Sequence, residues 1–125
     1  MFQGLGKIDV HLRISEGEVF VAEIKIWGGP ATLAEVVSQL LDRLTWREAF
    51  GVAVVISRNA DFGAVLKSIE DTLPQLPGAI PGSIRKLEEN VFVTRFSLPS
   101  DQSKQVEVHV RAYNLYTQRP SGRIS

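Results

Sequence analysis

Three charged residues at strand-like spacing are the part of this sequence best suited to chemistry. Asp9 lies in one run of alternating residues, and Glu23 and Lys25 lie in the next. Glu23 and Lys25 are two positions apart, so on a strand their side chains leave the same face. Charges beside a run as apolar as 19–22 are costly unless they have a partner or a metal. The pattern indicates a site on one face of a hairpin.

The pairing register of that hairpin decides whether Asp9 joins Glu23. A three-residue turn over 15–17, with a glycine at its last position, sets Ile14 opposite Glu18. Counting back then sets Asp9 opposite Glu23 on one face and pairs apolar residues on the other. The apolar pairs are Leu12 with Phe20, Val10 with Ala22 and Ile8 with Ile24. A two-residue turn would mix the two faces, which burial of one face disfavours.

The predicted cluster of two carboxylates and an ammonium suits phosphodiester hydrolysis. Two close carboxylates repel each other unless a cation lies between them. Mg²⁺ takes oxygen ligands and uses one or two carboxylates with water and substrate phosphate, and Mn²⁺ is an alternative. A neighbouring lysine can orient an attacking water or stabilise charge on a phosphate oxygen.

The residues Asp9 and Glu23-Ile24-Lys25, followed by a helix with Gln39 and an apolar strand, resemble the PD-(D/E)xK nuclease superfamily. The resemblance covers 6–73 and is to an uncharacterised bacterial branch. It implies a metal-dependent nuclease acting on nucleic acid, with DNA as the expected substrate. Asp9, Glu23 and the Ile24 carbonyl would hold Mg²⁺ or Mn²⁺. Lys25 would position the attacking water, and Gln39 would support that water or Lys25.

The same resemblance implies the fold. It predicts an α/β, restriction-endonuclease-like domain with a central mixed sheet and helices on its faces. The superfamily core usually opens with a helix before the Asp strand, whereas only 1–5 precede that strand here. We therefore expect a core without its N-terminal helix, completed by a homodimer partner or by another part of a longer protein. A sheet without that helix should expose an apolar face.

The segment after Lys25 predicts a strand–helix–strand unit. Thr32 and Glu35 match a capping box, and Trp46-Arg47 is expected to close the helix. The apolar positions of the helix form one stripe, with Gln39 on its flank. They are Leu33, Val36, Val37, Leu40, Leu41 and Leu44. The continuous apolar run 51–57 is typical of a central strand, and the crossover order predicts that it pairs in parallel with the Glu23 strand.

The second half of the chain predicts one more helix and two strands. Asn59 is the expected N-cap of a helix through Leu73, and 74–82 is a loop. The runs 90–98 and 105–113 read as antiparallel strands around a polar turn. The second of them alternates apolar with polar residues, which is typical of a half-exposed strand at a sheet edge.

Composition limits the possible classes of protein. The 125 residues predict a single domain, 1–125, with 117–125 as a polar tail. There is no cysteine, so disulfide frameworks and thiolate metal sites are excluded, and we expect a cytoplasmic protein. No apolar run is long enough to cross a membrane. The formal net charge of zero counts against a protein that binds DNA non-specifically on its own. If the substrate is nucleic acid, we expect a dimer partner or a further domain to supply part of the binding affinity.

Other interpretations of the same residues remain open. The charged trio could be a salt-bridge network on an exposed sheet face, although Val19 and Val21 make that face apolar. His11 is one pleat from Asp9 and is expected to be a surface or supporting residue rather than a ligand. His109 is expected on a solvent face. The alternative functions are a non-catalytic nucleic-acid- or protein-binding module that retains the nuclease fold, and an assembly domain.

Overall fold

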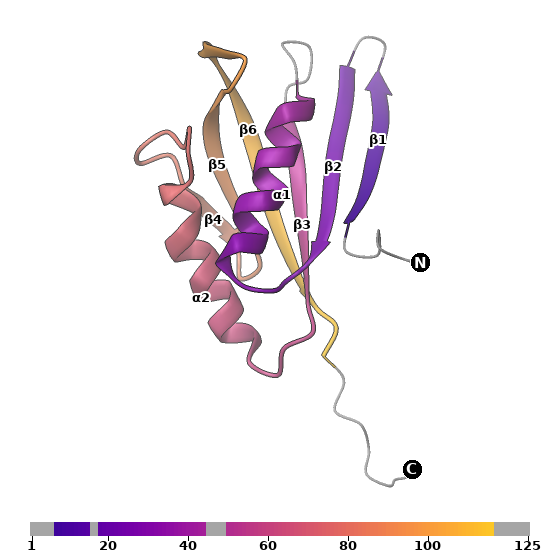
Figure 1. Cartoon of the computed structure of the whole chain (residues 1–125), viewed down its shortest axis with the longest axis vertical. Coiled ribbons are helices and arrows are strands. Elements are labelled where there is room, and N and C mark those ends of the chain that lie inside the picture. The colour runs from indigo at the N-terminus through magenta and orange to yellow at the C-terminus, as the bar shows by residue number, and fades with distance from the viewer. Residues whose placement is uncertain (1–6, 16–17, 45–49, 117–125) are drawn as a thin grey trace, which may run out of the picture.

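The computed structural model describes residues 7–15, 18–44 and 50–116, with side chains over 21–44 and 51–116. These residues form an α/β fold in which two helices pack on a mixed sheet (Figure 1). The elements in chain order are β1 (Lys7–Ser15), β2 (Glu18–Ile26), α1 (Pro30–Arg43), β3 (Phe50–Ser57), α2 (Phe62–Thr72), a 3-10 turn (Leu73–Gln75), β4 (Arg85–Glu88), β5 (Val91–Leu98) and β6 (Asp101–Asn114).

In the described part of the chain, six strands form one sheet in the order β1-β2-β3-β6-β5-β4. β3 pairs in parallel with β2 on one side and with β6 on the other, and the remaining pairs are antiparallel. The predicted parallel pairing of β2 with β3 is therefore confirmed. It follows from the helical crossover between them, which returns the chain to the same end of the sheet.

The register of the first hairpin is confirmed over most of its length. Asp9 pairs with Glu23, and the three predicted apolar pairs from Ile8 to Leu12 are all present. The prediction that Ile14 lies opposite Glu18 is wrong, because Ser15 takes that position after a register shift that follows Arg13. A bulge of this kind absorbs one extra residue near the turn without changing the faces of the residues before it.

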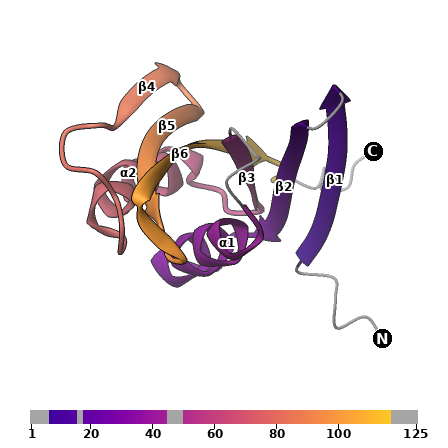
Figure 2. The ribbon, with the colours of Figure 1, turned by 90° about the horizontal axis from the view of Figure 1, so that it is seen from above.

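The predicted mixed sheet flanked by helices is confirmed, and both helices lie on the same face of that sheet (Figure 2). The connection from β2 to the parallel strand β3 passes through α1, and the connection from β3 to β4, which also runs parallel to β3, passes through α2. Both connections advance in the same direction across the sheet. Because right-handed crossovers fix the side on which the helix lies, two of them in one direction put both helices on one side.

A single hydrophobic core fills the space between the helices and the sheet. The five predicted apolar positions within α1, from Leu33 to Leu41, and the C-cap residue Leu44 are all buried. α2 adds Val65 and Ile69, and the sheet contributes large side chains such as Phe92 and Phe96. The helical stripes were thus predicted correctly from their spacing.

The starts of the two helices differ from prediction. α1 begins at Pro30, and its N-cap is Gly29, which has a φ of 123° that favours glycine. Thr32 lies inside the first turn, where its hydroxyl accepts a hydrogen bond from the Gly28 N–H, so the capping box is wrong. The N-cap of α2 is Asp61 rather than Asn59. Trp46-Arg47 lies outside the described residues.

The prediction that the last strand lies at a sheet edge is also wrong. β6 lies between β3 and β5, and the short, exposed β4 is at that edge instead. β6 does alternate, with Val106, Val108 and Val110 buried. The alternation arises because only one face of the sheet is covered by helices, not because the strand lacks a neighbour. β6 also begins at Asp101, so the polar turn is shorter than predicted.

The face of the sheet opposite the helices carries apolar side chains in β2 and β3. Ile24, Val54 and Ile56 are partly exposed there, and Ile26 is 38% exposed. No helix in the described ranges covers this face (Figure 2). None of the described helices has the length and apolar character needed to cross a membrane.

Candidate functional site

The hairpin register builds the polar centre of the candidate site. Asp9 lies at the position directly opposite Glu23, and Lys7 lies at the position opposite Lys25. Directly opposite residues of an antiparallel pair share a face of the sheet. His11 and Arg13 follow at alternate positions of β1, so the face that carries Glu23 is polar throughout the edge strand.

Glu23 is a fully buried acid beneath α1. Its side chain has no exposed surface, and Val21, its neighbour on the same face, is also buried in the core. Burying a carboxylate in such surroundings costs several kcal/mol unless a charge partner accompanies it. One such partner is Arg43, whose Nε lies 2.9 Å from Glu23 Oε2. The ion pair joins the middle of β2 to the last turn of α1.

Lys25 is held by the same helix. Its Nζ lies 2.8 Å from Glu35 Oε1, and its side chain is 19% exposed, whereas that of Glu35 is 57% exposed. The structure therefore brings Lys25 to the first half of α1 and Glu23 to the end of α1. Sequence analysis missed both of these helix partners, assigning Glu35 to a helix cap.

Gln39 lies midway between the two partners on the helix. Glu35, Gln39 and Arg43 are spaced four residues apart, so they form one stripe along α1. Gln39 is partly buried, and its Oε1 is fully buried without a hydrogen-bond partner among the described residues. A buried amide oxygen without a partner is costly, which makes this atom a candidate for binding a water or an ion. The four-residue spacing is the sequence signal that would have revealed the stripe.

The groups around Glu23 include several oxygen atoms of the kind that bind divalent metals. Among the side chains that the structure describes, no group of three or more His, Cys, Asp or Glu residues comes together. The oxygen groups here are the Glu23 carboxylate, which is paired with Arg43, the Ile24 carbonyl of a strand paired on both sides, and the Gln39 Oε1, with Asp9 at the register position opposite Glu23. All of these are hard oxygen donors, the type that Mg²⁺ and Mn²⁺ prefer. The donor chemistry fits, and the Arg43 guanidinium supplies positive charge at the same carboxylate.

His109 lies away from this cluster. It is on the face that the helices leave open, because it pairs with Val52 and Val93 in the register of β6. It is partly buried rather than free on a solvent face, and its Nε2 lies 3.2 Å from Glu107 Oε1. It is therefore not a member of the Glu23 site.

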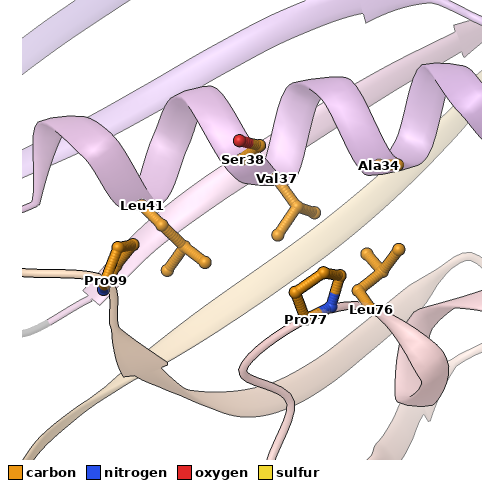
Figure 3. A pocket seen from close by; sticks show the side chains of 7 residues that line it. All are labelled: Ala34, Val37, Ser38, Leu41, Leu76, Pro77 and Pro99. Atoms are coloured by element: carbon orange, nitrogen blue, oxygen red, sulfur yellow. The ribbon is translucent and has the colours of Figure 1, made fainter. Parts of the chain in front are cut away.

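An apolar hollow on the other flank of α1 is a weaker candidate (Figure 3). It has a volume of about 110 Å³ and lies between α1, the segment after α2 and the turn before β6. Its lining residues are Ala34, Val37, Ser38, Leu41, Leu76, Pro77 and Pro99. None of these is an acid, a base or a metal ligand of the usual kind, so the hollow lacks the groups that catalysis needs.

Comparisons with protein-family models, with curated proteins and with solved structures find no match for this chain. The superfamily resemblance consequently rests on Asp9, Glu23-Ile24-Lys25 and Gln39, and it stays a prediction.

Proposed function

We propose that this chain is a metal-dependent nuclease domain of the restriction-endonuclease-like type that hydrolyses phosphodiester bonds, with DNA as its substrate. The observation that carries the proposal is Glu23: an acid with no exposed surface, directly opposite Asp9 in the register and two residues before Lys25. A buried acid of this kind is expensive, and functional sites are where such costs are commonly found.

Each residue then has a role that follows from its place. Asp9, Glu23 and the Ile24 carbonyl would hold Mg²⁺, which when bound supplies Lewis-acid activation and neutralises phosphate charge. Lys25 would orient the attacking water, after exchanging its contact with Glu35 for one to the reacting groups. Gln39, with a buried oxygen that has no described partner, would accept a hydrogen bond from that water.

Positive charge beside the site supports a polyanionic substrate. Lys7 and Arg13 share the Asp9 face of β1 by alternation, and β1 is an edge strand that a nucleic-acid backbone can approach. Phosphate contacts from Lys and Arg supply most of the non-specific affinity of nucleic-acid-binding proteins.

The test is a cleavage assay with Mg²⁺ or Mn²⁺ on single- and double-stranded DNA and on RNA. Wild type should cleave at least one substrate, and EDTA should stop the reaction. Lys25→Ala should lose cleavage while it keeps metal binding, since a cation has been removed from beside the metal. Lys67→Ala is a suitable control, because Lys67 pairs with Asp71 on the exposed surface of α2. Equal cleavage by wild type and Lys25→Ala would reject the proposal.

A non-catalytic binding module is the second candidate, and the ion pairs favour it. Glu23 has Arg43 as a partner, and Lys25 has Glu35, so these contacts can serve to fasten α1 to the sheet. This candidate predicts nucleic-acid or protein binding that does not change when divalent metal is removed.

A further inference from the structure

We infer that Arg43 is a positioning residue that holds the Glu23 carboxylate when no metal is bound, and that a divalent cation must displace it. The inference rests on the proposed metal site and names the group that controls access to it. Arg43 becomes a competitor of the metal rather than a passive part of the fold.

The ion pair is short, and its acidic partner is buried. The two groups are 2.9 Å apart, and the acid is fully buried. The Lys25–Glu35 pair is equally short, at 2.8 Å, but its acid is 57% exposed, and the Arg85–Glu107 and Lys67–Asp71 pairs are longer, at 3.5 Å and 3.3 Å. Exposed pairs contribute little, whereas a buried acid depends strongly on its partner.

The Arg43 guanidinium and a divalent metal ion should not bind the Glu23 carboxylate at the same time, because their combined positive charge would exceed the negative charge of the site. Asp9 and Glu23 together carry two negative charges when ionised, which one divalent cation neutralises. Arg43 in place beside that cation would add a third positive charge next to a fully buried carboxylate, and like charges at such short distances repel. Metal binding to Glu23 is therefore favoured only when the guanidinium moves away.

The released guanidinium has a favourable place to go. The Arg43 side chain is already 36% exposed, so it can turn into water without crossing the core. Arg43 also lies in the last turn of α1, where the helix dipole favours positive charge. The exchange is thus asymmetric: Arg43 can leave Glu23, whereas the buried Glu23 cannot leave its site.

The experiment is isothermal titration of the metal-free protein with Mn²⁺ alone and with Mg²⁺ alone. Arg43→Gln should bind metal at least about tenfold more tightly than wild type, a difference of about 1.4 kcal/mol. Arg43→Lys keeps a positive charge on the same helix turn, so its affinity should stay within about threefold of wild type. Arg85→Gln is the matched control, because it removes an arginine from a carboxylate pair on the far strand β4 and should leave affinity unchanged.

A measurement on wild type keeps the test valid if Arg43→Gln does not fold. The side-chain Nε–H resonance of Arg43 should shift during a Mg²⁺ titration, as its contact with Glu23 is lost, while that of Arg85 stays in place. Unchanged or weaker metal binding by folded Arg43→Gln, or a stationary Arg43 resonance at metal saturation, would overturn the inference.

The outcomes also separate this inference from the proposed function. Metal binding that depends on Asp9 and Glu23 but is not tightened by Arg43→Gln removes the inference and leaves the nuclease proposal standing. Tighter binding by Arg43→Gln, with no cleavage by any variant, leaves the inference standing and removes the nuclease proposal.

Discussion

Removing the two partners of the Glu23–Arg43 pair one at a time should have unequal effects on stability. Arg43→Gln leaves a fully buried carboxylate with less positive charge nearby, and losing one partner of a buried pair costs about 3–5 kcal/mol. The glutamine amide can still donate a hydrogen bond, and the Arg43 side chain is partly exposed to water. We therefore expect a loss of unfolding free energy at the lower limit of this range, about 3 kcal/mol.

Glu23→Gln should cost less, about 1 kcal/mol, because the partly exposed Arg43 can turn to water and the new amide is uncharged. Urea unfolding at neutral pH and low divalent metal, followed by far-UV circular dichroism, measures both free energies. Domains of this size are commonly stable by about 5–15 kcal/mol, so the difference is resolvable.

The m-values should stay equal among the variants, which shows that the change lies in stability and not in the unfolded state. Lys67→Gln, in an exposed pair on α2, should change stability by less than about 0.5 kcal/mol. If Glu23→Gln proves as costly as Arg43→Gln or costlier, then Arg43 is the group that depends on the pair, and the asymmetry that underlies the metal-exchange inference is wrong.

Three further outcomes are expected. Mg²⁺ or Mn²⁺ should raise the melting temperature of wild type but not of Asp9→Asn or Glu23→Gln, because a ligand of the folded state stabilises it by mass action; equal shifts in a thermal-shift titration would place the metal elsewhere. Gly51→Ala should lower stability by about 1–3 kcal/mol in chemical denaturation, since its Cβ would lie 2.8 Å from Cδ1 of the fully buried Leu40; an unchanged midpoint would mean that Leu40 adjusts freely. Light scattering should show a homodimer formed through the uncovered sheet face, and Ile26→Glu should convert it to a monomer; a wild-type monomer rejects this assembly.

The enzyme and binding-module proposals differ in what the α1 stripe is for. If the stripe only fastens α1 to the sheet, Glu35, Gln39 and Arg43 should affect stability alone. If it serves a metal site, their substitution should also change metal affinity or cleavage. Gln39 is the most discriminating of the three, because its buried oxygen has no described partner whose loss would destabilise the fold.

Local pattern predicted the first hairpin and the helical stripes well. The alternation in β1 and β2 allows only one register that keeps apolar residues on one face, so Asp9 opposite Glu23 followed from sequence. The stripe of α1 followed from its 3.6-residue period in the same way. Local pattern failed at the helix starts, where several residues compete for the N-cap and small differences in backbone geometry decide among them.

The sequence by itself determined which residues of α1 face the core, how β1 pairs with β2 as far as Arg13, and that β2 and β3 run in parallel. Only the tertiary structure decided that β6 lies inside the sheet, because alternation reports which face is covered and not which strand is adjacent. It also decided the partners of Glu23 and Lys25. Those contacts depend on how α1 is placed along and across the sheet, which is fixed by packing of the whole core against residues distant in the chain.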